Sequence, residues 1–179
     1  MDHWSIGLLL ALLLVASWTD ITRHKIYNWT TYPGIAVALG LSAAEFGAVD
    51  LSDSFAGFFA CGAIMLVCFV LFNMGGGDLK LIAMMGAFLG LHRGIEAMLW
   101  TFVLGGIMGT AILIWEVGVV RLVTNTVKHL WLVIRARGWL PLTEEERKPL
   151  RRWLVLAPSA LAAVCVMLLD DRYRVFDRY

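Results

Sequence analysis

Where one long apolar segment ends and the next begins, the chain reads GGGDLK over residues 75–80 and continues as LIAMMGAFLG over residues 81–90. This stretch sets an aspartate, Asp78, on a run of glycines at a membrane boundary. A carboxylate is costly to place there and usually has a function. A second aspartate, Asp20, ends the first apolar segment of the chain. Two carboxylates at matching depths favour an aspartyl hydrolase built within a lipid bilayer.

The composition is that of a polytopic membrane protein. Of the 179 residues, 60% are hydrophobic and only 16% are charged, with a mean hydropathy of +0.75. An ordinary soluble domain has an apolar share of about 45–50% and could not bury so much apolar surface. The net charge of +1 lacks the basic excess typical of nucleic-acid binding. We therefore predict one membrane-embedded domain over residues 1–179, with the lipid bilayer and not nucleic acid as its surroundings.

Six apolar segments come near the roughly 20 residues that a helix needs to cross the hydrocarbon core. They cover residues 4–19, 30–47, 55–73, 79–91, 95–119 and 153–169. The runs are continuous rather than alternating, which predicts an all-α integral membrane protein with about six transmembrane helices and not a barrel. Gly86, Gly90 and Gly94 recur at four-residue spacing, which predicts close packing between helices.

The placement of Lys and Arg predicts which loops face the cytoplasm. If both termini are outside, the inner loops hold Arg23, Lys25, Lys80, Arg121, Lys128, Arg135, Arg137, Arg147, Lys148, Arg151 and Arg152. The outer parts hold only Arg93, Arg172, Arg174 and Arg178. This asymmetry predicts that Asp20 and Asp78 share the cytoplasmic side. Residues 120–152 mix apolar and basic residues, which predicts an amphipathic cytoplasmic segment before the last helix.

The cysteines and histidines form no metal-binding or disulfide pattern. Cys61, Cys68 and Cys165 all lie inside apolar segments without a Cys-x-x-Cys pair, and the sequence has no His-x-x-x-His. A zinc site, a disulfide framework and a metalloprotease are therefore disfavoured. We predict neither a metal nor another cofactor.

Two close carboxylates can hydrolyse a peptide bond without a metal. One is ionised and takes a proton from water, while the other is protonated and donates to the substrate carbonyl. The two aspartates are therefore the predicted catalytic pair. Gly75, Gly76 and Gly77 permit close approach of another chain, so we predict that they bind an extended substrate. Lys80 is placed in the same substrate-binding group; it either tunes Asp78 or only fixes the helix at the membrane surface.

At these residues the chain resembles the prepilin peptidases, which are membrane aspartyl proteases with a Gly-x-Gly-Asp motif. Their first motif, an Asp followed by a basic stretch and Ile-Pro-Asn, corresponds here to DITRHKIYN over residues 20–28, with Tyr27 in place of the usual Pro. Their second motif corresponds to GGGDLK over residues 75–80. We expect no methyltransferase region of the kind that the larger enzymes carry, because the chain has neither the room nor the cysteine pairs for it. The chain is similar to the short, peptidase-only subclass of tight-adherence (Flp-type) pilus systems.

The resemblance implies a peptidase of the bacterial inner membrane that cleaves type IV prepilin-like precursors on the cytoplasmic side, just before a hydrophobic helix. Asp20 and Asp78 would be its catalytic residues. Presenilin-like proteases share Gly-x-Gly-Asp but usually carry a Tyr-Asp first motif, whereas this chain has Thr19-Asp20. Two alternatives from other classes remain open. One is an ion- or proton-coupled transporter that uses paired carboxylates, and the other is a non-catalytic scaffold of a secretion system.

Overall fold

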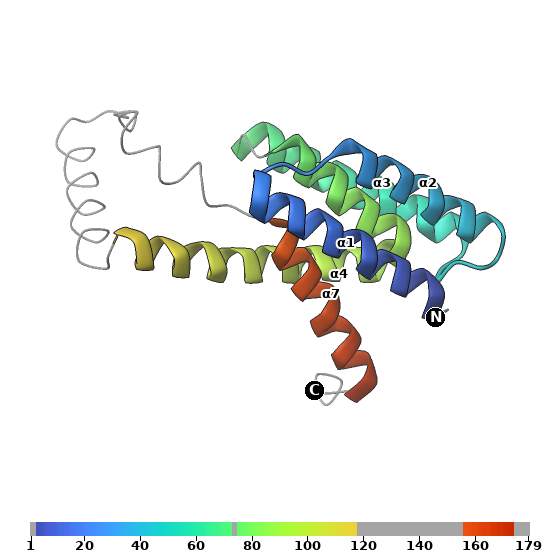
Figure 1. Ribbon diagram of the computed structural model, residues 1–179. Coiled ribbons are helices and arrows are strands. Elements are labelled where there is room, and N and C mark those ends of the chain that lie inside the picture. Colours follow the sequence, from blue (N-terminus) through green and yellow to red (C-terminus); the bar gives the residue numbers. More distant parts are fainter. Residues whose placement is uncertain (1–2, 73–74, 118–155, 174–179) are drawn as a thin grey trace. The chain divides into compact units, whose positions relative to one another are not determined.

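The computed structural model of the protein describes residues 3–72, 75–117 and 156–173. Within these ranges the regular elements are all helices, which confirms the predicted all-α class (Figure 1). The five helices are α1 (His3–Arg23), α2 (Asn28–Ala43), α3 (Leu51–Phe72), α4 (Gly76–Val117) and α7 (Leu156–Tyr173).

Three stretches of these helices are long and apolar enough to cross a membrane, namely Trp4–Arg23, Leu51–Leu71 and Gly76–Ile112. Leu156–Asp170 forms a shorter apolar helix. A membrane protein is thus supported, while the total of about six spans stays a prediction. The amphipathic segment predicted at 120–152 lies outside the described residues.

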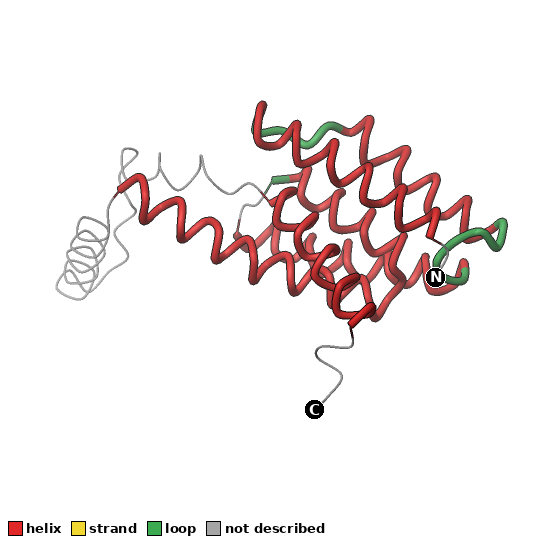
Figure 2. The backbone as a smooth tube through the Cα atoms, turned by 60° about the horizontal axis from the view of Figure 1, so that its bottom comes forward, coloured by secondary structure: helices red, strands yellow, loops and turns green. Residues whose placement is uncertain are grey.

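The chain divides into two compact units, residues 1–105 together with 155–179, and residues 106–154. Of the second unit, the structure describes residues 106–117, the end of α4. Within the first unit, α1 packs against α2 and α7, and α2 packs against α3. Figure 2 shows the connections from α1 to α2 and from α2 to α3 at opposite ends of these helices. The single domain over 1–179 stays a prediction.

The first arm of α4 is the central helix of the first unit. Every residue from 81 to 90 is buried, on all sides of the helix. A helix that is apolar all round is stable only when neighbours surround it. Apolar side chains of the other helices provide that cover, among them Leu9, Leu13, Met65, Ala160 and Val164, all of which are fully buried.

A break at Gly90 divides α4 into two arms. Gly90 has φ 79° and ψ −173°, a backbone conformation that is essentially restricted to glycine. It lies between the apolar segments predicted at 79–91 and 95–119. A Cβ atom on Gly94 would lie 2.9 Å from Cα of Gly86, so the second arm starts alongside the first. The spacing of these glycines correctly predicts close packing, but Gly90 itself is the turn.

The residues that follow the start of α3 satisfy backbone groups on both sides of this break. Oγ of Ser54 donates to the carbonyl of Ala87 over 2.6 Å, and Oδ1 of Asp53 accepts the N–H of Leu91 over 3.1 Å. Helix ends leave such N–H and C=O groups without partners inside the helix. Asp53 therefore caps the second arm of α4 from a different helix.

Removing this cap should destabilise the break at Gly90 that separates the two arms of α4. Asp53→Ala leaves the Leu91 N–H without its acceptor, and we expect a loss of roughly 1–2 kcal/mol in the free energy of unfolding. Asp53→Asn keeps an acceptor oxygen in place and is the matched control. Thermal unfolding in detergent, followed by tryptophan fluorescence, measures the difference. Equal midpoints for Asp53→Ala and the wild type would contradict the capping role.

Candidate active site

Asp20 lies on the buried face of α1, close to the end of that helix. It is only 7% exposed and follows the buried Ala16, whereas Trp18 on the opposite face is 72% exposed. The helix ends because His24 adopts a left-handed conformation (φ 50°), and its N–H donates to the carbonyl of Asp20 over 2.9 Å. A carboxyl group is thus held inside the protein at the end of an apolar helix.

The start of α7 supplies a hydrogen-bond donor to Asp20. The N–H of Ala157 donates to Oδ2 of Asp20 over 3.1 Å, and Ala157 is fully buried. Ala157 is in the first turn of α7, so its N–H has no partner within the helix, and the positive end of the helix dipole faces the carboxylate. This contribution was not predicted from the sequence. In the sequence, only Pro158 indicates that a helix begins near Ala157, because proline is tolerated in the first turn of a helix.

Asp78 lies half-buried in the first turn of α4, where its N–H donates to the carbonyl of Gly75 over 3.1 Å. The glycine run makes room for its side chain. A Cβ atom on Gly75 would lie 2.8 Å from Oδ2 of Asp78, and one on Gly77 would lie 3.0 Å from Cβ of Ile26. Gly75 and Gly76 are exposed. The backbone just before Asp78 is therefore both close to the carboxyl group and accessible.

The two predicted catalytic aspartates lie within electrostatic range of each other. The charge of Asp20 acts directly on Asp78, although the two carboxyl groups come from different helices. Two carboxylates at short range repel each other when both are ionised, so such a pair favours one negative charge and one shared proton. In the part of the chain that the structure describes, no three His, Cys, Asp or Glu side chains gather closely enough to hold a metal ion.

The connection between α1 and α2 docks onto the start of α4. Ile26 lies against Gly77, and Nζ of Lys80 donates to Oδ1 of Asn28 over 2.8 Å. The same ammonium group lies 4.7 Å from the centre of the Tyr32 ring, within the range of a cation–π interaction. Lys80 thus has two protein partners, which its sequence context did not predict. Its role in substrate binding stays a prediction.

Tyr27, which stands where the resembling family usually has a proline, is the N-cap of α2. Its φ of −82° and ψ of 140° are close to what proline, with φ near −65°, could also adopt. The Tyr27 hydroxyl accepts a hydrogen bond from Nη1 of Arg23 over 3.3 Å. The tyrosine therefore keeps a turn that suits proline and adds a link back to α1.

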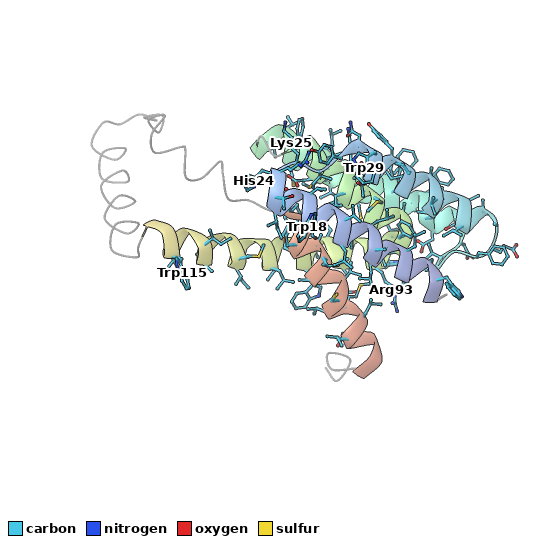
Figure 3. The ribbon with its side chains drawn as sticks, viewed as in Figure 1. Trp18, His24, Lys25, Trp29, Arg93 and Trp115 are labelled. Atoms are coloured by element: carbon cyan, nitrogen blue, oxygen red, sulfur yellow. The ribbon has the colours of Figure 1, made fainter. Side chains whose placement is uncertain are left out.

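Aromatic and basic side chains gather at the end of the helices that carries Asp20. Trp18 and Trp29 are exposed there, and tryptophan is enriched at membrane–water interfaces. Figure 3 shows His24 and Lys25 at this same end, whereas Arg93 lies toward the end at which α1 begins. The aspartates thus lie near the ends of α1 and α4 rather than at the middle of these helices, and their depth in the membrane stays a prediction.

Comparison with known proteins identifies the family of the chain. The model of the type IV leader peptidase family matches residues 7–110, more than half of the chain, and this range includes both aspartates. The start of α7, which donates to Asp20, lies beyond it. No curated protein and no solved structure matches the chain. On the extent of the family match, the chain belongs to the type IV leader peptidase family.

Proposed function

We propose that the protein is a membrane-embedded aspartyl endopeptidase that removes the leader peptide of type IV prepilin-like precursors at the cytoplasmic face of the bacterial inner membrane. Membership of the family supports a peptidase that acts on such leaders. The observation that carries the aspartyl mechanism is that Asp20 and Asp78, at the ends of two helices, lie near enough for the charge of one to act on the other. Paired carboxylates of this kind hydrolyse peptide bonds in aspartic proteases.

In this mechanism Asp20 is the base and Asp78 is the acid. The hydrogen bond from the Ala157 N–H stabilises negative charge on Asp20, and Asp78, beside that charge, holds the proton. Asp20 takes a proton from water while the water oxygen attacks the scissile carbonyl carbon, and Asp78 protonates the carbonyl oxygen. The tetrahedral diol then collapses. Asp20 gives its proton to the leaving amine and Asp78 recovers one from a diol hydroxyl, which restores the starting state.

The exposed backbone at Gly75 and Gly76 is the proposed contact for the substrate chain around the scissile bond. It directly precedes Asp78, so a peptide held there in an extended conformation would present its carbonyl group to the acid. The hydrophobic helix of the precursor would remain in the bilayer. The cytoplasmic orientation is supported by the basic residues Arg23 and Lys25 next to the Asp20 end of α1.

Cleavage of a pilin-like precursor by the purified protein in lipid nanodiscs tests this function. We expect mass spectrometry to find one cut, just before the hydrophobic segment of the precursor. The same precursor lacking its leader is the matched control and should stay intact. A full-length precursor that remains uncut would contradict the proposal. Proton flux into vesicles without proteolysis would favour the transporter alternative.

The hydrogen bond from α7 to Asp20 gives a separate prediction. Ala157→Pro removes the donor N–H at a position where a helix tolerates proline, and we expect cleavage to slow by about 10- to 100-fold, as for loss of a hydrogen bond to a charged group. Ala157→Gly keeps the N–H and is the matched control. Initial rates of precursor cleavage measure both variants. A rate for Ala157→Pro equal to that of Ala157→Gly would contradict the role of this N–H.

A further inference from the structure

The hydrogen bond between Lys80 and Asn28 joins the two segments that carry the aspartates. Lys80 follows Asp78 within the first turns of α4, and Asn28 opens α2 after the short connection from Asp20. Their side chains meet over 2.8 Å. The hydrogen bond therefore links the segment that follows Asp20 to the helix that carries Asp78.

Two further contacts hold the same junction. The Tyr32 ring, one turn into α2, lies 4.7 Å from the Lys80 ammonium group, so the cation is held by two groups of the same helix. Ile26, in the connection from α1 to α2, lies against Gly77 just before Asp78. Three contacts thus join the start of α4 to the α1–α2 connection and the first turns of α2.

We propose that Lys80 and Asn28 are positioning residues, whose hydrogen bond sets the Asp78 carboxyl group opposite that of Asp20. The inference rests on the proposed function, because it explains how the predicted pair is kept together. Asn28 is uncharged, so its side chain cannot act on the aspartates by a charge of its own. Lys80 could also act by its charge or by binding substrate, and the comparison of the two residues separates these roles.

Precursor cleavage by four variants and one control variant tests the proposal, with kcat and KM measured separately. Lys80→Met and Asn28→Leu should each lower kcat by about tenfold, as expected for loss of one hydrogen bond, with KM nearly unchanged. The double variant should be no slower than the slower single variant, because both changes break the same contact. Lys80→Arg keeps the donor and should restore most of kcat. Lys25→Met, which removes an exposed cation from the same connection, is the matched control and should cleave like the wild type.

Two results would overturn the inference while leaving the proposed function intact. In the first, Lys80→Met raises KM alone, which is the signature of substrate binding. In the second, the losses of the two single variants multiply in the double variant, which means that the residues act independently.

A distance measurement tests the same contact without any cleavage. Spin labels on cysteines at the exposed positions Ile21 and Gly76, with the native cysteines replaced by alanine, report the separation of the two helix ends. Lys80→Met and Asn28→Leu should broaden this distance distribution to the same extent, and an unchanged distribution would overturn the inference. If the wild type cleaves no precursor, the proposed function fails and this measurement still decides the positioning role.

Discussion

Replacement of Asp20 or Asp78 by asparagine is expected to slow precursor cleavage by about 10⁴-fold or more. Asparagine keeps the size of the side chain and its acceptor oxygen, but it can neither take a proton from water nor give one to the substrate carbonyl. The effect should lie in kcat, because the proton transfers occur in the chemical step. Rates of leader removal in nanodiscs, followed by mass spectrometry, measure the loss for each variant.

The matched control for these variants is Asp50→Asn. Asp50 is an exposed acid in the connection between α2 and α3, at the other end of the helices from Asp20. Its replacement removes one carboxylate without touching the proposed pair, so cleavage should continue at the wild-type rate. Wild-type cleavage by both Asp20→Asn and Asp78→Asn would show that the aspartates are not the catalytic groups.

Replacement of Gly90 by alanine is expected to lower the free energy of unfolding by roughly 3 kcal/mol or more. Two causes add. The backbone at Gly90 has a φ of 79°, which side-chain-bearing residues rarely adopt, and a Cβ atom there would collide with the Asp53 carboxylate and lie 3.1 Å from Cγ1 of Val49. The collision also displaces the cap on Leu91, so both arms of α4 lose support.

Gly40→Ala is the matched control for Gly90→Ala. Gly40 lies inside α2, and no heavy atom lies within 4 Å of the position that its Cβ would take. Alanine has the higher helix propensity, so this change should leave stability unchanged or raise it by up to about 1 kcal/mol. Thermal unfolding and the yield of monodisperse protein in detergent measure both variants. Equal stability of Gly90→Ala and Gly40→Ala would contradict the account of the turn.

The class of the fold and the positions of its helices follow from the sequence because continuous apolar runs have few other solutions in a bilayer. The predicted run at 55–73, for example, corresponds to α3 at Leu51–Phe72. The turn at Gly90 could not be assigned in the same way. A glycine spacing predicts close packing, but it does not tell which glycine has a positive φ, since that depends on contacts with Asp53 in another helix.

The candidate site, too, could be predicted only in part from the sequence. The sequence singles out Asp20 and Asp78 because acids are rare in apolar segments and need a reason to be there. It does not reveal the Ala157 N–H, because any residue except proline carries that donor and the contact joins distant parts of the chain. The hydrogen bond between Lys80 and Asn28 could not be predicted from the sequence either, since each residue type has many possible partners at a membrane surface.

The central claim is that Asp20 and Asp78 work as one catalytic unit, and a double-mutant cycle tests it most directly. Cleavage rates of Asp20→Asn, Asp78→Asn and the double variant are compared in the same nanodiscs, with long incubations to detect residual activity. If the aspartates act together, each single variant loses almost all activity and the double variant is no slower than the slower single variant. Wild-type cleavage by either single variant, or losses that multiply in the double variant, would contradict the account.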